Sequence, residues 1–342
     1  MTDEKGRYTQ SGKAQSLESY FEGKPNGLSV IRAILAAIVC VSHVGWIYGE
    51  DNLQIRSLGV YSVAVFFGIS GFLIYQSAAN SNGIKLFAMK RIRRIFPAFI
   101  MVLIATAFVY YPLYQFIFNG SSVKFLSLEQ LLYIGSNISL HVFKPEFGVP
   151  LEFSETQDWN PSLWTLEFEF LLYFLCYLVS RLVKNYSKVL IPFLTIFFVV
   201  TTKVQLYPDF LREAAYLAQF FFFGMTIWLF KKCIKLTIKT VLMFVFGVTV
   251  SYLVLEEFVL TSGFLILLSL VAGTAFKLGR FQDTDYSYGI YLHSGPVTHL
   301  AVLAINKADL PLITGYIMSL IFSVLAGILS WHLIESRFKN RK

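Results

Sequence analysis

The sequence predicts an all-α, polytopic membrane protein, a bundle of about ten transmembrane helices with both termini in the cytoplasm. Of its 342 residues, 56% are hydrophobic and only 15% are charged, a balance that soluble domains do not show. Apolar runs near the length that crosses a bilayer, about 20 residues, recur along the chain. They lie at 28–49, 57–77, 95–117, 161–182, 188–203, 212–230, 239–255, 258–276, 286–304 and 311–334.

Basic residues predict the orientation of these spans. Short loops that are rich in Lys and Arg stay in the cytoplasm, and here they alternate with loops that have few basic residues. The chain is therefore expected to comprise a polar cytoplasmic N-terminal segment (1–27), a transmembrane domain (28–335) and a basic cytoplasmic tail (336–342). The net charge of +8 follows from these dispersed loops and needs no nucleic-acid partner.

The first predicted span contains Arg32 and His43. On a helix they lie on one face, roughly 16 Å apart along the axis. Ionisable residues inside a span are expensive, so two on one stripe suggest a lined internal path and a membrane-embedded site. The alternative is that Arg32 extends to lipid headgroups and that His43 is simply hydrogen-bonded between helices.

A basic cluster precedes the third predicted span, with Lys90 followed by an Arg-x-x-Arg element formed by Arg91 and Arg94. These two arginines share a helix face and could clamp the phosphates of an anionic ligand. The alternative is an orientation signal that contacts lipid headgroups.

A long outer segment, 118–160, follows the third span. It contains an apolar piece, 126–143, and then an acidic stretch. The apolar piece predicts a helix that lies in the membrane interface or dips into the protein. Long ordered loops usually have a purpose, which favours a lid or an acceptor-binding role over a mere connector.

The fourth predicted span opens with Trp164 and carries Glu167 and Glu169. These two carboxylates are separated by roughly 200° around a helix, so only one can face a given pocket. Tyr173 shares the face of Glu169. Glu169 and His43 are expected at comparable depth, roughly 12 and 9 Å from the outer ends of their spans, where they could form a base and its orienting group.

Other chemistries lack their motifs. The sequence has no Gly-rich phosphate loop, no His-Glu-x-x-His element and no paired Cys-x-x-Cys, so we expect no metal site. Ser70 lies in a Gly-Ile-Ser-Gly phrase that lacks one residue of a nucleophile elbow. Cys40 and Cys176 fall in predicted spans and Cys233 in a cytoplasmic loop, so no disulfide is implied.

Several phrases along the chain resemble the acyltransferase-3 family of integral membrane acyltransferases, which includes bacterial O-antigen and other polysaccharide O-acetyltransferases. Each phrase is short, but they run in the family's order across most of the chain. Thr165 replaces the usual Ser of the Trp-Ser-Leu-x-x-Glu phrase, which identifies Glu169 as the matching carboxylate. The matching positions are Arg32 with His43, 65–72, 91–94, 164–169, 287–293 and 335–338.

The resemblance implies a membrane O-acyltransferase of the bacterial inner membrane. It would move an acyl group, most simply acetyl, from cytosolic acyl-CoA to a hydroxyl of a cell-surface sugar such as a unit of the O-antigen of lipopolysaccharide. Acetyl-CoA would be a co-substrate, no cofactor would be tightly bound, and the saccharide acceptor would be free or lipid-linked. The alternative is a transporter or flippase of a lipid-linked saccharide, without acyl transfer.

The resemblance also assigns roles to the candidate residues. His43 would be the general base or would carry the acyl group transiently, and Glu169 would orient it or bind the acceptor. Arg91 and Arg94 would bind the phosphates of the donor, and Arg32 would meet its pantetheine arm or pyrophosphate further in. Acceptor binding or structural support is expected of Ser70, Trp164, Tyr173, Tyr288 and His293.

Overall fold

The computed structural model describes residues 15–21, 27–49, 53–120, 126–204, 208–275 and 284–339. Within these ranges the chain is helical and has no strand apart from an isolated antiparallel bridge between Ser16 and Lys235, which confirms the all-α prediction. Most of the predicted N-terminal segment 1–27, and residues 340–342 of the predicted tail, lie outside the described residues.

The elements follow one another along the chain with short connections, except between α6 and α7. They are α1 (Leu17–Phe21), α2 (Leu28–Tyr48), α3 (Leu53–Ala79), α4 (Ile84–Ala105), η1 (Thr106–Tyr110), α5 (Tyr111–Asn119), α6 (Leu128–Asn137), α7 (Trp164–Leu182), η2 (Lys184–Tyr186), α8 (Ser187–Lys203), α9 (Asp209–Phe230), α10 (Ile238–Leu253), α11 (Phe258–Ala275), α12 (Ser287–Lys307), α13 (Leu312–Ser330), η4 (Trp331–Glu335) and α14 (Ser336–Lys339).

Each predicted span contains a helix, and seven helices of the described chain are long and apolar enough to cross a membrane. Three predicted spans are not long or apolar enough by this measure. They are α7, which carries three charged residues, α10, which has only 16 residues, and α12, which is rich in Ser, Tyr and His. The protein is therefore an integral membrane protein. The count of ten spans and the side of the termini stay predictions.

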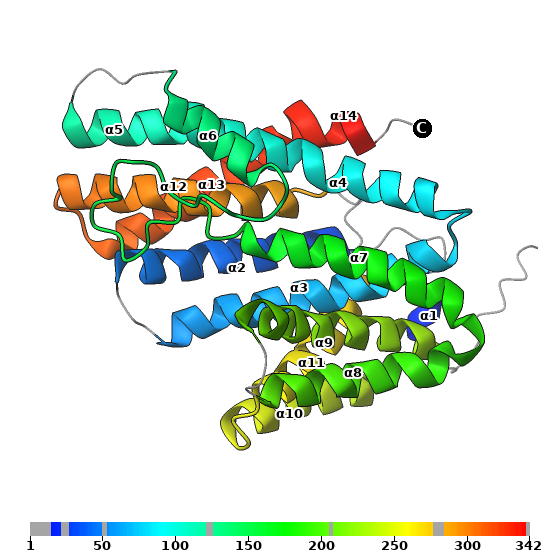
Figure 1. Cartoon of the computed structure of the whole chain (residues 1–342). Helices are drawn as coiled ribbons and strands as arrows, with labels where there is room; N and C mark the ends of the chain where they lie inside the picture. Colours follow the sequence, from blue (N-terminus) through cyan, green and yellow to red (C-terminus); the bar gives the residue numbers. More distant parts are fainter. Residues whose placement is uncertain are drawn as a thin grey trace, which may run out of the picture.

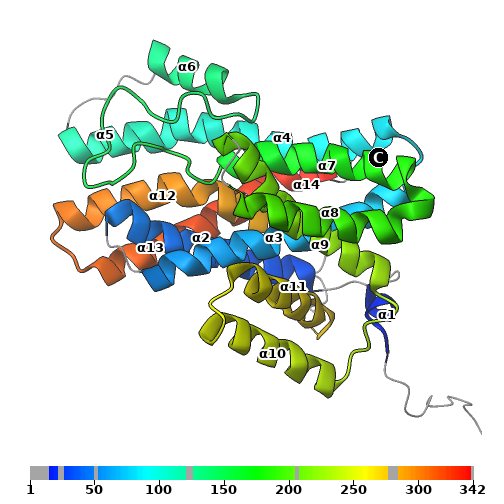
Figure 2. The same cartoon turned by 60° about the horizontal axis from the view of Figure 1, so that its bottom comes forward.

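Figure 1 shows the long helices running side by side, with α2 and α3 in the middle of the bundle. Helix α12 packs closely on α13 and α2, while α9 packs on α3 and α8. In both views α5, α6 and the α12–α13 turn gather at one end of the bundle, and α1, α14 and the start of α4 gather at the opposite end (Figures 1 and 2). The chain thus has two chemically distinct ends.

The α3–α9 contact depends on glycine. A Cβ atom at Gly71 would lie 1.9 Å from the backbone oxygen of Phe221, and one at Gly224 would lie 1.9 Å from the backbone oxygen of Gly68. Only the missing side chains let the two backbones approach this closely. The Gly-Ile-Ser-Gly phrase therefore has a packing role, which leaves Ser70 between two close-packed turns.

Helix α6 fills the predicted apolar piece of the outer segment. A capping box formed by Ser127 and Gln130 starts it. It buries Gln130 and Tyr133 against the protein, whereas Leu131 and Leu132 are exposed. A helix with its polar face inward and its leucines outward suits a membrane interface. The predicted interfacial position is consistent with this orientation, and the lid or acceptor role stays a prediction.

Candidate active site

A cavity of about 860 Å³ opens at the end of the bundle where α4 begins. Arg32 near the start of α2, Ser77 near the end of α3 and Lys339 in α14 all lie on its wall, so the cavity faces the side that the basic loops predict to be cytoplasmic. Most of the predicted site residues meet here. They are Arg32, Ser70, Arg91, Arg94, Glu169, Tyr173 and Tyr288.

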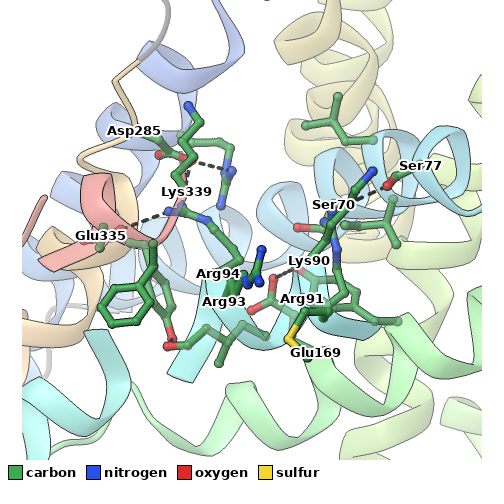
Figure 3. Close-up of a pocket in the computed structure, with 18 of the residues that line it drawn as sticks. Ser70, Ser77, Lys90, Arg91, Arg93, Arg94, Glu169, Asp285, Glu335 and Lys339 are labelled. Atoms are coloured by element: carbon green, nitrogen blue, oxygen red, sulfur yellow. Dashed lines mark hydrogen bonds and ion pairs between the residues drawn. The ribbon is translucent and has the colours of Figure 1, made fainter. Parts of the chain in front are cut away.

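Two carboxylates hold the arginines of one wall. Asp285 Oδ2 accepts from Arg32 at 2.9 Å and from Arg94 at 2.7 Å, and Glu335 Oε2 accepts from Arg94 at 2.9 Å. Burial opposes ionisation of Asp285, but the two guanidinium groups outweigh it and lower the pKa of Asp285 to about 2. Figure 3 shows Asp285 and Glu335 on one side of the cavity, with the basic side chains of α4 beside them.

Neither Asp285 nor Glu335 is among the site residues predicted from the sequence. The sequence gives only weak signs that these two carboxylates belong to the site. Asp285 lies just before the ninth predicted span, and Glu335 interrupts an otherwise apolar run. The π-helical turn η4 presents Glu335 to Arg94, and the Ser330 hydroxyl donates to its other oxygen at 3.0 Å. Such turns are common at functional sites and are not visible in a hydrophobic pattern.

Arg91 differs from its neighbours. Its guanidinium lies over the rings of Phe87 and Tyr173, 5.6 and 5.7 Å from their centroids, and its Nη2 donates to the Ser77 hydroxyl at 3.4 Å. Among the described residues no carboxylate forms an ion pair with Arg91, and its buried Nε has no hydrogen-bond partner. A cation held by aromatic rings, with donors to spare, is suited to an anionic ligand.

Glu167 and Glu169 face different surroundings. Glu169 lines the cavity and accepts a hydrogen bond from Tyr173, while Glu167 pairs with His141 Nδ1 at 2.7 Å. The helical spacing of the two carboxylates accounts for this difference. No contact joins Glu169 to His43 in the described structure, so the predicted base-and-orienter pair is not formed directly.

A second, much narrower cavity of about 40 Å³ continues from the first. The two cavities share Arg32, Ser70, Glu169 and Tyr288. From these residues the narrow cavity follows α3, α7 and α12 toward the opposite end of the bundle, as far as Thr165 and Tyr291.

His43 lies beyond this narrow cavity and lines neither one. Its Nδ1 is 3.4 Å from the Ser294 hydroxyl. That hydroxyl donates to the backbone oxygen of Tyr291 at 2.8 Å, so it is free to accept from His43 Nδ1–H. The arrangement leaves His43 Nε2 unprotonated. Ser294 therefore occupies the orienting position that the sequence analysis gave to Glu169.

Two predicted residues lie away from the cavities. His293 Nδ1 is hydrogen-bonded to the Tyr110 hydroxyl at 2.8 Å and turns toward η1. Trp164 is 38% exposed and packs on Phe168, with 6.0 Å between ring centroids. Neither residue faces Glu169 or the arginines, and a surface Trp at a helix end is typical of a membrane interface.

The arrangement combines a basic cavity for a polyanionic ligand, a narrow extension and a histidine with a free basic nitrogen. In the described ranges no group of three or more His, Cys, Asp or Glu residues could hold a metal ion. The chemistry that the side chains themselves can supply is proton transfer by His43 and anion binding by the arginines.

Comparison with known proteins gives a consistent result. The acyltransferase-3 family model, described as an acyltransferase domain, matches residues 26–332. An O-acetyl transferase of Shigella phage Sf6 is 29% identical over 344 aligned residues, which cover 93% of this chain and 97% of the phage protein. The acyltransferase MdmB of Streptomyces mycarofaciens is 28% identical over 137 residues, 40% of this chain and 32% of that protein. No solved structure matches the chain.

Proposed function

Since this chain belongs to the acyltransferase-3 family and is a membrane acyltransferase, we propose that it transfers an acetyl group from cytosolic acetyl-CoA to a hydroxyl of a cell-surface sugar. The name of the phage relative, an O-acetyl transferase, supports acetyl and oxygen as the group and the acceptor atom. The sugar, as in an O-antigen unit, and the inner membrane of a bacterium belong to the proposal. A transporter without acyl transfer is set aside, because family membership makes the chain an acyltransferase.

The basic cavity carries the proposal. Its volume of about 860 Å³ lies within the usual range for a ligand of drug or nucleotide size, about 300–1,000 Å³. Coenzyme A is polyanionic, and Arg91 and Lys90 enter the cavity without a carboxylate partner in the described structure. Phosphates would bind to these side chains with charge-assisted hydrogen bonds. Arg32 and Arg94, held by Asp285, would meet the pyrophosphate at the head of the pantetheine arm.

The narrow cavity would carry the thioester toward His43. Glu169 and Ser70 lie where the two cavities meet, so their role in this proposal is to position the pantetheine arm. Arg32 and His43 are roughly 16 Å apart along α2. An arm that reaches the junction of the two cavities would place a cytosolic acyl group in the narrow cavity, on the side of the bundle that leads to His43.

The reaction then needs one base. His43 Nε2 takes the proton of the acceptor hydroxyl, and the oxygen of that hydroxyl attacks the thioester carbonyl carbon. The tetrahedral intermediate collapses with cleavage of the carbon–sulfur bond, and the imidazolium returns the proton to the coenzyme A thiolate. Charge and protons balance without an external base, and the products are the sugar ester and coenzyme A.

The first experiment measures transfer of radiolabelled acetyl from acetyl-CoA to envelope glycans in membranes that contain wild type or His43→Ala. We expect His43→Ala to lose about 100-fold or more of the activity. His332→Ala is the matched control, because His332 is exposed and lines neither cavity. Equal labelling by wild type and His43→Ala at equal amounts of folded protein would refute the role of His43.

A further inference from the structure

The narrow cavity ends at a hydrogen-bonded pair. The Thr165 and Tyr291 hydroxyl oxygens are 2.8 Å apart, and they join α7 to α12. Thr165 donates to the backbone oxygen of Ser162 at 3.2 Å, so the Tyr291 hydroxyl is the donor in the bond between them. The Phe66 ring of α3 lies 6.2 Å from the Tyr291 ring, centroid to centroid. Three helices thus meet at the end of the cavity.

His43 lies directly behind this pair. One turn beyond Tyr291 on α12 is Ser294, and the Ser162 hydroxyl is 3.1 Å from the Ser294 hydroxyl. Ser294 in turn is the residue that contacts His43. A group that leaves the narrow cavity toward His43 therefore meets Thr165 and Tyr291 first.

The size of the narrow cavity limits what can enter it. Its whole volume, including the part along the four shared residues, is about 40 Å³. One water needs about 10–15 Å³ by this measure, so the cavity has room for about three non-hydrogen atoms. An acetyl group has three. A butyryl group would have to displace the Tyr291 ring or break its bond to Thr165.

We propose that Thr165 and Tyr291 form an acyl-length filter: the narrow cavity that they close has room for an acetyl group and excludes longer acyl groups. The inference rests on the proposed function, since it assumes an acyl-CoA donor in the adjoining cavity. Tyr291 is the specificity-determining residue, because its ring closes the cavity. Thr165 holds the ring in place through its hydroxyl oxygen.

The test compares kcat/KM for acetyl-CoA and butyryl-CoA in the same preparation, so that the ratio does not depend on the folded fraction. In Tyr291→Ala the butyryl-to-acetyl ratio should rise about 10-fold or more, the scale on which a pocket discriminates methylene groups. Tyr291→Phe keeps the ring but removes its bond to Thr165, so its butyryl-to-acetyl ratio should lie between those of wild type and Tyr291→Ala. Tyr286→Ala is the matched control, because Tyr286 precedes α12 and lines neither cavity.

A second measurement applies to variants that bind the acyl-CoA donor but do not transfer its acyl group. Butyryl-CoA should raise the Tm of detergent-solubilised Tyr291→Ala as much as acetyl-CoA does, and should raise the wild-type Tm less. An unchanged ratio in active Tyr291→Ala, or equal stabilisation of wild type by both donors, would overturn the filter. Absence of transfer from every acyl-CoA by wild type would instead overturn the proposed function.

Discussion

Ser294 defines the tautomer of His43, which lies deep in the bundle. Its hydroxyl proton goes to the backbone oxygen of Tyr291, so its lone pairs accept from His43 Nδ1. A base needs its free nitrogen to point at the substrate, and a hydrogen bond to the other nitrogen supplies that orientation. Ser294 is a positioning residue in this scheme, since it acts through His43.

Substitution of Ser294 tests this role. Ser294→Ala should lower kcat about 10-fold to 100-fold and leave KM for acetyl-CoA within about twofold, because the donor cavity is untouched. Ser294→Thr keeps the hydroxyl and should restore most of kcat. Steady-state kinetics in membranes checks both variants. A large rise in KM without a fall in kcat would show that Ser294 serves donor binding instead.

Asp285 is the second residue whose role can be isolated. The pKa of Asp285 is lowered to about 2 from its ordinary value near 3.8. The ion pairs of Asp285 therefore stabilise the fold fully at pH values above about 3.8. This contribution is lost only as the pH falls toward 2 and is constant between pH 5 and 8. Asp285→Asn leaves Arg32 without its acidic partner. We expect a loss of about 1–3 kcal/mol of stability, less than for a fully buried pair because both arginines are partly exposed.

The distinguishing readout for Asp285 is rescue by ligand. The phosphates of coenzyme A can supply the missing anion, so coenzyme A should raise the Tm of Asp285→Asn more than that of wild type. Asp209→Asn is the control, because Asp209 pairs with Arg212 at 2.6 Å on the surface and lies outside the cavity. Equal Tm shifts on addition of coenzyme A in Asp285→Asn and wild type would contradict the idea that Asp285 pairs with an arginine that binds phosphate.

At the scale of elements, the hydrophobic pattern was sufficient for every long helix, because a run of apolar residues in a bilayer has little alternative to a helix. The pattern also separated Glu167 from Glu169 by angle alone. It could not pair His43 with Ser294, since depth along an axis says nothing about which neighbouring helix is faced. Nor could it reveal η1 and η4, whose π-helical turns depend on tertiary contacts such as Gln130 to the backbone oxygen of Ala107, 2.8 Å.

The α3–α9 crossing offers a test at this scale. In Gly71→Ala the new methyl would collide with the backbone of Phe221, which cannot move without separating the helices. We expect a loss of roughly 1–3 kcal/mol or more and reduced activity, since Ser70 and the cavity wall shift with α3. Gly263→Ala in α11 is the control, because its nearest contact would be an ordinary 3.6 Å. Tm and folded yield in detergent are the measurements, and equal values for the two variants would argue against a tight crossing.

For the whole molecule, the candidate site is arranged along the long axis of the helix bundle. The basic cavity lies at the end of the bundle that includes α1 and α14, while the long segment between α6 and α7 lies toward the other end (Figures 1 and 2). His43 lies in the second half of α2. The narrow cavity extends from the basic cavity toward His43 and ends at Thr165 and Tyr291. In the proposed function, a donor and an acceptor from opposite sides meet inside the protein, and this proposal gives a role to the ionisable residues within apolar helices.

The orientation of this axis can be tested with the protein's own cysteines. Cys40 and Cys176 are buried, whereas Cys233, in the turn between α9 and α10, is exposed. The basic residues around Cys233 predict that it faces the cytoplasm. A membrane-impermeant maleimide should therefore label wild type in inside-out vesicles and leave it unlabelled in intact spheroplasts. In a Cys233→Ser background, Ala308→Cys in the exposed α12–α13 turn should show the reverse. Labelling of Cys233 from outside would show that the orientation in the membrane is the reverse of the predicted one. The basic cavity would then be out of reach of cytosolic acetyl-CoA.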